Sequence, residues 1–267
     1  MSGAGNDFVV IDNRTRSIQN ANEFARTVCD RRWGIGADGL LLIEESQIAV
    51  YRMMYYNADG SYGGMCGNGG RCISLYAVEN AIAGEDHSFE ALDHIYKATV
   101  HGTNVTLTMR DPKDIRMNVV LRGGANPLKG HFVNTGSPHV VIPLAVVKRL
   151  YGKLSEVPVA ELGRKIRYHR LLQPEGANVN FMQKTSANSL GLRTYERGVE
   201  AETLACGTGS IASAIVASRI WKMTPPITVV PPSGVKLVVD FKTNGSTYSN
   251  VCLTGEAKIT FKGEIDG

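Results

Sequence analysis

The sequence predicts an α/β (α+β) fold with two pseudo-symmetric domains, each a mixed or antiparallel sheet wrapped around a central helix. Two internal matches carry this prediction. A shift of 131 positions places Gly5–Asp12 (GNDFVVID) over Gly136–Pro143 (GSPHVVIP), and a shift of 140 places Cys66–Gly69 (CGNG) over Cys206–Gly209 (CGTG). Both halves keep the order glycine turn, VVI strand, tyrosine strand and Cys-Gly-x-Gly. We therefore interpret the chain as an internal duplication.

Chain-breaking residues around 111–130 suggest where the two halves meet. We expect an N-terminal domain at 1–117 and a C-terminal domain at 118–256. Residues 257–267 are expected to pack back onto the first domain.

The two halves differ at their beginning. In the second half, His131–Thr135 (HFVNT) is predicted to form a strand that leads into Gly136. Only Met1–Ala4 precede the matching Gly5. We therefore expect the first domain to lack its opening strand.

The local pattern within each half supports alternating strands and helices. Strands are predicted where β-branched and aromatic residues cluster, at Phe8–Asp12, Leu40–Glu44, Tyr51–Tyr56, Tyr96–Val100, Val105–Arg110, Val140–Pro143, Val179–Gln183, Leu192–Tyr195, Ile227–Val230, Val235–Val239 and Ala257–Phe261. Helices are predicted at Glu23–Asp30, Arg71–Ala83 and Ser210–Trp221. The third is almost wholly apolar, which indicates a buried helix at the centre of a sheet.

Composition excludes several classes of function. A chain of 267 residues with 43% hydrophobic and 20% charged residues is typical of a globular protein with a sizeable core. Its formal charge of +4 is spread without a basic run, so neither nucleic acid nor a membrane is an expected partner. No apolar run approaches the roughly 18 residues of a membrane span. Met1 is followed at once by polar residues rather than a signal peptide, so we expect a cytoplasmic protein.

Two of the five cysteines precede a glycine cluster and a predicted helix. The first N–H groups of a helix carry partial positive charge, which stabilises a thiolate and lowers the pKa of a thiol there. Glycines also let a bound carboxylate approach these N–H groups closely. Cys66 and Cys206 therefore each combine an acidic thiol with an anion-binding turn.

A duplicated fold would bring these two cysteines to opposite sides of one ligand. That geometry suits stereo-inversion at a carbon next to a carboxylate. One thiolate removes the α-proton while the opposite thiol donates a proton to the other face. The two helix termini would stabilise the negative charge that develops on the carboxylate.

Other interpretations of the cysteines fit less well. Cys29, Cys72 and Cys252 are expected to be small buried hydrophobes, and an odd cysteine count in the cytosol predicts thiols rather than disulfides. Cys66 and Cys72 are too far apart for common zinc spacing, so no metal is expected. The first glycine cluster lacks the Lys-Ser/Thr of a phosphate-binding loop, and neither cluster fits a dinucleotide-binding turn. No cofactor is expected.

Seven motifs in order resemble the signature of the diaminopimelate epimerase family, and the matches cover residues 3 to about 258. They are Gly5–Asp12 (GNDFVVID), Asn57–Gly60 (NADG), Met65–Cys72 (MCGNGGRC), Gly136–Ile142 (GSPHVVI), Asn178–Phe181 (NVNF), Tyr195–Gly198 (YERG) and Glu202–Gly209 (ETLACGTG). The resemblance implies a cofactor-independent isomerase that interconverts LL- and meso-diaminopimelate. It also implies a role in lysine and peptidoglycan synthesis and a homodimer.

The resemblance also implies roles for individual residues. Cys66 and Cys206 take the places of the two catalytic cysteines, as proton acceptor and donor for the LL substrate. His139 and Glu196 match groups that tune the thiols. The remaining matches bind substrate: the backbone N–H groups of Gly67, Asn68, Gly207 and Thr208 would hold the α-carboxylate, and Asn6, Asn57, Ser137, Asn178, Glu196 and Arg197 would hold the distal end.

Two positions depart from the family pattern. Ser137 stands where many members have asparagine, so one distal contact is expected to be weaker or made through water. Gly39 stands where some members have glutamine, so the contact of that side chain is expected to be absent.

Two alternatives stay open from the sequence. Proline racemases and hydroxyproline epimerases resemble the chain in their two Cys-Gly-x-Gly sites, although a histidine commonly follows their first Cys-Gly and Asn68 stands here. A small cyclic substrate would also leave Glu196 and Arg197 without a distal partner. A non-catalytic amino-acid-binding protein on the same scaffold would need neither cysteine.

Overall fold

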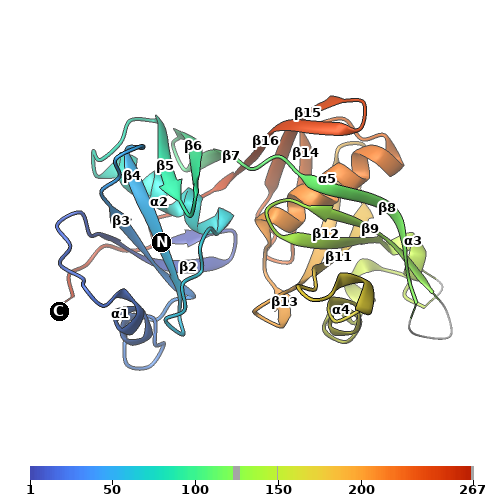
Figure 1. The fold of residues 1–267 in the computed structure, drawn as a ribbon, viewed down its shortest axis with the longest axis horizontal. Coiled ribbons are helices and arrows are strands. Elements are labelled where there is room, and N and C mark those ends of the chain that lie inside the picture. Colours follow the sequence, from blue (N-terminus) through green and yellow to red (C-terminus); the bar gives the residue numbers. More distant parts are fainter. Residues whose placement is uncertain (123–126, 149, 266–267) are drawn as a thin grey trace. The chain divides into compact units, whose positions relative to one another are not determined.

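The computed structural model describes residues 1–122, 127–148 and 150–265. The chain forms two compact units (Figure 1). Unit 1 comprises Met1–Met109 and Thr254–Gly267, and unit 2 comprises Arg110–Leu253. The chain therefore leaves unit 1 for unit 2 and returns to unit 1 at its C-terminal end.

Unit 1 contains two helices and a run of paired strands (Figure 1). In chain order the elements are β1 (Ser2–Gly3), β2 (Asn6–Asp12), α1 (Ala21–Val28), β3 (Gly39–Glu44), β4 (Tyr51–Asn57), α2 (Gly67–Glu79), β5 (Asp86–Ala91), β6 (His94–His101) and β7 (Asn104–Thr108).

Unit 2 contains the longer series of elements. They are β8 (Lys113–Leu121), β9 (Leu128–Asn134), β10 (Pro138–Pro143), α3 (Leu144–Val147), η1 (Leu154–Glu156), α4 (Val159–Arg167), η2 (Arg170–Leu172), β11 (Asn178–Lys184), β12 (Ser189–Glu196), β13 (Ala201–Thr203), α5 (Gly207–Trp221), β14 (Ile227–Val230), β15 (Leu237–Asn244) and β16 (Thr247–Glu256). Strand β16 begins in unit 2 and ends in unit 1, where it pairs with β7.

The strand pairings repeat between the units. In unit 1, β1 to β6 pair in sequence as antiparallel, parallel, antiparallel, parallel and antiparallel. In unit 2, the series β9, β10, β11, β12, β14 and β15 pairs in the same five orientations. The duplication and the mixed sheets predicted from the sequence are confirmed.

Each unit has one helix that packs against many strands. Helix α2 contacts β1, β2, β3, β4, β6 and β7, and helix α5 contacts β9, β10, β11, β12, β14 and β15. Ten residues of α5 are buried, including Ile211 and Ile215, which have no exposed surface. A helix that is apolar on all sides is stable only inside a core, which the six strands in contact with α5 provide.

Two local expectations are wrong. Residues Ser2 and Gly3 do form a strand, β1, in a short antiparallel pairing with β2. Residues 257–261 form no strand; the last strand is β16, and only Lys258 makes an isolated bridge, with Ser2. The compact units divide between Met109 and Arg110, and the boundary expected between residues 117 and 118 corresponds to a position within β8.

Part of the predicted boundary stretch, residues 123–126, lies outside the described residues. The boundary between the two duplicated halves, expected between residues 117 and 118, therefore stays a prediction. Residues 254–265 lie in unit 1, where the backbone N–H of Ala257 donates to the Thr103 carbonyl oxygen at 2.8 Å.

Candidate active site

Cys66 is the N-cap residue of helix α2, directly before its first residue, Gly67. Its backbone is extended (φ −115°, ψ 123°), and its carbonyl oxygen accepts the first helical hydrogen bond from the Gly70 N–H at 2.7 Å. The residue is half-buried. The N–H groups of the first helical turn, starting at Gly67, have no partner within the helix and carry its positive end. The predicted placement of Cys66 at a helix N-terminus is confirmed.

Cys206 occupies the matching place in unit 2. Its backbone has nearly the same conformation (φ −124°, ψ 112°), and its carbonyl oxygen accepts from the Ser210 N–H at 2.9 Å as α5 begins. Its thiol is buried, and the sulfur lies 3.6 Å from the Thr208 hydroxyl oxygen. The Thr208 carbonyl oxygen accepts from the Thr135 hydroxyl at 3.0 Å, which fixes the backbone of the turn.

A chain of hydrogen bonds joins two of the predicted binding residues in unit 1. The Asn68 amide nitrogen donates to the Asn6 side-chain oxygen at 2.6 Å, and the Asn6 nitrogen donates to the Asp38 carboxylate at 2.8 Å. Asn68 itself accepts a hydrogen bond from Arg71 at 2.7 Å. Arg31 binds the other Asp38 oxygen at 2.8 Å. Asn6 is therefore held, in the unit that carries Cys66, by a helix residue, Asn68, and by a loop carboxylate, Asp38.

Asn57 lies at the end of β4 and is held by its neighbours. Its side-chain oxygen accepts from the Tyr55 hydroxyl at 2.8 Å, and its nitrogen donates to the Ser61 hydroxyl at 3.0 Å. The Tyr55 ring lies directly over Gly39, where a Cβ atom would come within 2.6 Å of the ring. The departure at Gly39 thus has a physical reason, because Tyr55 fills the space that a side chain there would need.

His139 is completely buried in unit 2, near the start of β10, where Asn178 of β11 is its neighbour. The Asn180 amide nitrogen donates to His139 Nδ1 at 3.1 Å, so the proton of the neutral ring is on Nε2. That Nε2 atom has no hydrogen-bond partner within the described part of the chain. Burial, with a smaller contribution from the charge of Arg197, lowers the pKa of His139 to about 3. His139 is therefore neutral at physiological pH.

Asn180 is fixed from three sides. Its oxygen accepts from the buried Thr194 hydroxyl at 3.0 Å, and its nitrogen also donates to the Val140 carbonyl oxygen at 3.2 Å. A Cβ atom on Gly209 would lie 2.4 Å from the Asn180 oxygen and 3.3 Å from the Cys206 sulfur. Asn180 thus links the orientation of the His139 ring to the turn that carries Cys206.

Asn178 and Arg197 lie together in unit 2. The Asn178 side chain donates to the Pro138 carbonyl oxygen at 3.2 Å and accepts from the Arg197 backbone N–H at 2.8 Å. The Arg197 guanidinium is held loosely, with Nη1 at 3.4 Å from the Glu175 carbonyl oxygen and 4.0 Å from its carboxylate. A third of the Arg197 side chain is exposed (34%), so its guanidinium can bind a carboxylate of a ligand.

Glu196 precedes Arg197 and is only partly exposed. Desolvation raises the pKa of its carboxyl group above the ordinary value. Ser137 is half-exposed in the turn before β10, and its carbonyl oxygen accepts from the Thr135 N–H at 3.1 Å. The structure thus places Asn6, Asn57, Cys66, Gly67 and Asn68 in unit 1 and the other predicted residues in unit 2.

The remaining cysteines do not share this setting. Cys29 and Cys72 are buried, as predicted, and burial raises the pKa of Cys29 to about 11 and that of Cys72 to about 12. Cys252 is half-buried in β16, which differs from the expectation of full burial. All five cysteines are thiols and none forms a disulfide with a described partner.

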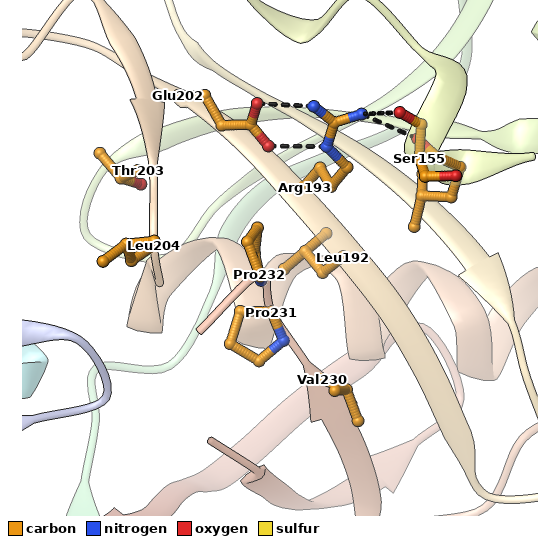
Figure 2. A pocket seen from close by; sticks show the side chains of 10 residues that line it. Ser155, Leu192, Arg193, Glu202, Thr203, Leu204, Val230, Pro231 and Pro232 are labelled. Atoms are coloured by element: carbon orange, nitrogen blue, oxygen red, sulfur yellow. Dashed lines mark hydrogen bonds and ion pairs between the residues drawn. The ribbon is translucent and has the colours of Figure 1, made fainter. Parts of the chain in front are cut away.

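Two cavities in the molecule lie away from the predicted residues. One, of about 670 Å³, is lined by β12, β13 and the start of the segment after β14 (Figure 2). Its arginine, Arg193, makes a double ion pair with Glu202 at 2.7 Å and donates to the carbonyl oxygens of Leu154, Ser155 and Val157. All of its donor nitrogens are used, so this cavity offers no free cation. The second, of about 570 Å³, lies between β2 and residues 259–265 in unit 1.

Three residues at the site were not found from the sequence: Tyr55, Arg71 and Asn180. Tyr55 shares one face of β4 with Asn57, so the two-residue spacing was a usable signal. Asn180 likewise alternates with Asn178 on β11. Arg71 gave no such signal, because an arginine early in a helix is normally exposed.

Among the described residues, no cluster of three or more His, Cys, Asp or Glu side chains is arranged to hold a metal ion. Similarly, no helix in the described ranges has both the length and the apolar character needed to cross a membrane.

Comparison with known proteins places this geometry in a family. The family model for diaminopimelate epimerase matches residues 1–115 and 131–260. The diaminopimelate epimerase of Chlorobaculum tepidum is 44% identical over 269 residues, which cover 99% of both chains. That of Flavobacterium psychrophilum is 39% identical and covers 98% of this chain and 97% of its own. The Aquifex aeolicus enzyme is 38% identical, with 99% and 96% covered.

Solved structures of other families share the fold. A phenazine biosynthesis protein of the PhzF family from Bacillus anthracis superimposes with a TM-score of 0.66 at 14% identity, covering 96% of this chain and 92% of its own. A probable proline racemase from Agrobacterium radiobacter gives 0.65 at 14% identity, covering 92% and 83%. At such identity the likeness concerns the fold alone. The family model and the relatives that match over nearly the whole chain show more than the fold: the chain belongs to the diaminopimelate epimerase family.

Proposed function

We propose that the protein interconverts LL- and meso-diaminopimelate by a two-base mechanism that uses Cys66 and Cys206 and no cofactor. One observation carries the proposal. Each of the two structurally repeated units presents a cysteine in the same extended conformation at the start of a glycine-rich helix. Such a pair supplies one base and one acid. Because both groups are thiols, they can exchange these roles, as a reaction that runs in both directions requires.

The proposed reaction is a proton exchange at one carbon. The Cys66 thiolate removes the α-proton of the LL substrate, and the electron pair of the broken C–H bond moves into the carboxylate to form an enediolate. The Cys206 thiol then donates its proton to the opposite face of that carbon. Cys66 ends as the thiol and Cys206 as the thiolate, so the meso substrate is converted in the reverse direction.

The helix N-termini would stabilise the intermediate. The backbone N–H groups of Gly67, Asn68, Gly207 and Thr208 belong to the first turns of α2 and α5, where they carry partial positive charge. Charge on the substrate carboxylate increases as the α-proton leaves. Fixed donors that face this charge lower the barrier without reorganising during the reaction.

The distal amino-acid end of the substrate would be bound by polar side chains. Arg197 is loosely held and partly exposed, so it can form a bidentate pair with the distal carboxylate. Glu196 can accept a hydrogen bond from the distal ammonium group. Asn6, Asn57, Ser137 and Asn178 would complete this end, and neutral His139 would act by hydrogen bonding rather than by its charge.

The test is α-proton exchange in D₂O, followed by NMR. We expect LL-diaminopimelate to exchange its α-proton and to form the meso isomer, while L-proline stays unchanged. Cys66→Ser and Cys206→Ser should each lower the epimerisation rate by about 10²- to 10⁴-fold, the usual contribution of a general acid or base. Cys252→Ser is the matched control and should keep the wild-type rate.

Other outcomes would contradict the proposal. Exchange with proline alone would favour a proline racemase-like enzyme. Binding of diaminopimelate without exchange would favour an amino-acid-binding protein. Full activity in either of the two cysteine variants would remove the two-base mechanism. The homodimer and the role in lysine and peptidoglycan synthesis stay predictions from the resemblance, and the cytoplasmic location stays a prediction from the sequence.

A further inference from the structure

Arg71 is a charged residue in the core of unit 1. It lies in the second turn of α2 and has no exposed surface, which makes it the largest side chain that is fully buried among the described residues. Its Nη2 atom donates to the Asn68 side-chain oxygen at 2.7 Å, and its Nη1 atom donates to the Gly67 carbonyl oxygen at 3.2 Å. The guanidinium is therefore hydrogen-bonded to Gly67 and Asn68, the two residues that directly follow Cys66.

The positive charge of Arg71 is not neutralised by a carboxylate. No ion pair formed by the described residues includes it, and its Nε atom has no hydrogen-bond partner in that part of the chain. An arginine in a protein stays charged, and a buried charge without an opposite charge is costly. An anion close to Arg71 would offset this cost.

Two thiols lie near enough to interact with that charge. Burial lowers the pKa of Arg71, and its interactions with Cys72 and Cys66 oppose this effect. Cys72 is a poor anion, because it is fully buried and its pKa is raised to about 12. Cys66 is half-buried and also lies at the positive end of α2. Cys66 is therefore the thiol that can ionise beside Arg71.

The repeated helix in unit 2 has no such charge. The shift of 140 positions that aligns Cys66 with Cys206 aligns Arg71 with Ile211. Ile211 is fully buried and apolar. Asn68 correspondingly aligns with Thr208, whose hydroxyl lies near the Cys206 sulfur. The two cysteines share a backbone geometry and differ in their electrostatic surroundings.

We propose that Arg71 is a positioning residue that fixes Asn68 and favours the thiolate form of Cys66, so that Cys66 is the resting base and Cys206 the resting acid. The roles of base and acid rest on the proposed function. The electrostatic difference between the two cysteines does not depend on it. Without the substrate, Cys66 is then a thiolate at a pH at which Cys206 is still a thiol.

The test measures the ionisation of each cysteine separately. Wild-type protein is alkylated with iodoacetamide over a range of pH, and the rate at each cysteine is read by peptide mass spectrometry. Tryptic cleavage after Arg71 separates Cys66 from Cys72. We expect the Cys66 midpoint to lie at least about one pH unit below that of Cys206, a tenfold difference in thiolate fraction. Equal midpoints, or a lower midpoint for Cys206, would overturn the proposal without any variant.

Two variants of Arg71 separate the effect of its charge on Cys66 from the effect of its hydrogen-bonding geometry. In Arg71→Met, the Cys66 midpoint should rise by about one unit or more toward the ordinary thiol value near 8.5, while the Cys206 midpoint stays in place as an internal control. Fragment ions distinguish Cys66 from Cys72 in this variant. An unchanged Cys66 midpoint in folded Arg71→Met protein would contradict the proposal.

Arg71→Lys keeps the charge but cannot fork between Gly67 and Asn68. We expect its Cys66 midpoint to stay low while KM for diaminopimelate rises several-fold, because Asn68 loses its fixed orientation. A midpoint that rises as much in Arg71→Lys as in Arg71→Met would contradict the role of charge.

The two proposals fail in different ways. A low Cys66 midpoint that depends on Arg71, together with full activity of Cys66→Ser, would leave the present inference standing and remove the proposed function. Loss of activity in Cys66→Ser, with equal midpoints for both cysteines, would do the reverse.

Discussion

The imidazole of His139 is buried in unit 2, and Asn180 determines which of its nitrogens carries the proton. Because the Asn180 amide donates to Nδ1, the ring keeps its hydrogen on Nε2 and cannot accept one there. Protonation would place a charge in a fully buried position and would also break this hydrogen bond. The structure therefore favours one neutral tautomer, a state that sequence inspection alone could not predict.

A pH dependence of stability follows from this burial. The folded-state pKa of His139 is about 3, below the ordinary value near 6.5 that applies to the unfolded chain. Between these values the unfolded chain binds a proton that the folded chain does not, so the free energy of unfolding falls as the pH decreases. The loss approaches about 1.4 kcal/mol per pH unit for one proton.

Urea denaturation of wild-type protein and His139→Gln between pH 7 and pH 4 measures this effect. The variant should lose less stability on acidification than the wild type, because it lacks the titrating ring. Parallel pH profiles for the two proteins would show that His139 ionises as easily in the folded state as in the unfolded chain.

At the scale of single elements, α2 and α5 begin in the same way but tolerate different side chains. Gly69 and Gly209 are equivalent under the shift of 140 positions. A Cβ atom on Gly69 would meet the terminal Cδ2 atom of Leu41 at 3.1 Å. On Gly209 it would meet the Asn180 oxygen at 2.4 Å, and Asn180 is held by three hydrogen bonds. Only the second position is blocked by a fixed group.

This difference predicts that the same substitution will affect stability unequally at the two positions. Alanine in place of glycine inside a helix stabilises by about 0.5–1 kcal/mol where space permits. Gly69→Ala should therefore be close to neutral, since the small shift of Leu41 offsets this gain. Gly209→Ala should destabilise by about 1–3 kcal/mol through overpacking. Urea denaturation of both variants checks the prediction, and equal stability of the two would contradict the packing described around Asn180.

The elements that the sequence predicts best are those with one clear periodicity. Strands β3, β4, β10 and β11 carry runs of buried β-branched, aromatic or aliphatic residues, and α5 is apolar throughout. Strand β8 was missed, because most of its residues are exposed or half-exposed and two irregularities interrupt its pairing with β9. Helix α4 was also missed, although its apolar residues have helical spacing.

Strand β16 shows a different cause of error. Its sequence, TYSNVCLTGE, alternates between buried and exposed residues only in its second half. The apolar residues after it suggested a strand at 257–261, where the chain instead runs without a partner strand. The residues of the candidate site also differ in how well the sequence predicts them. The positions of Cys66 and Cys206 at helix N-termini were predictable from the glycines that follow them. The roles of Arg71 and Asn180 were not, because they depend on contacts with residues elsewhere in the fold.

At the scale of the whole molecule, unit 1 is made from two separate parts of the chain. Residues 254–265 return to it, where β16 pairs with β7 and Lys258 exchanges backbone hydrogen bonds with Ser2 at 2.8 Å. The Thr106 and Thr254 hydroxyls are also hydrogen-bonded at 2.7 Å. Unit 2, by contrast, is one continuous segment.

Removal of the returning segment should therefore affect the two units unequally. In a chain that ends at Leu253, we expect unit 1 to lose its order, since β7 and β1 both lose backbone partners, while unit 2 stays folded. Limited proteolysis with identification of the fragments checks this, with full-length protein as the control. Rapid cleavage within residues 110–253 and protection of residues 1–109 would be the contrary result.

The return of the chain to its first unit also sets an order for synthesis on the ribosome. The segment that completes unit 1 leaves the exit tunnel only after every residue of unit 2 has been translated. The continuous unit can thus adopt its native structure while the N-terminal one still waits for its closing strand. Cys66 would acquire its native surroundings only after this strand has emerged, which delays the appearance of a reactive thiolate until both units have been translated.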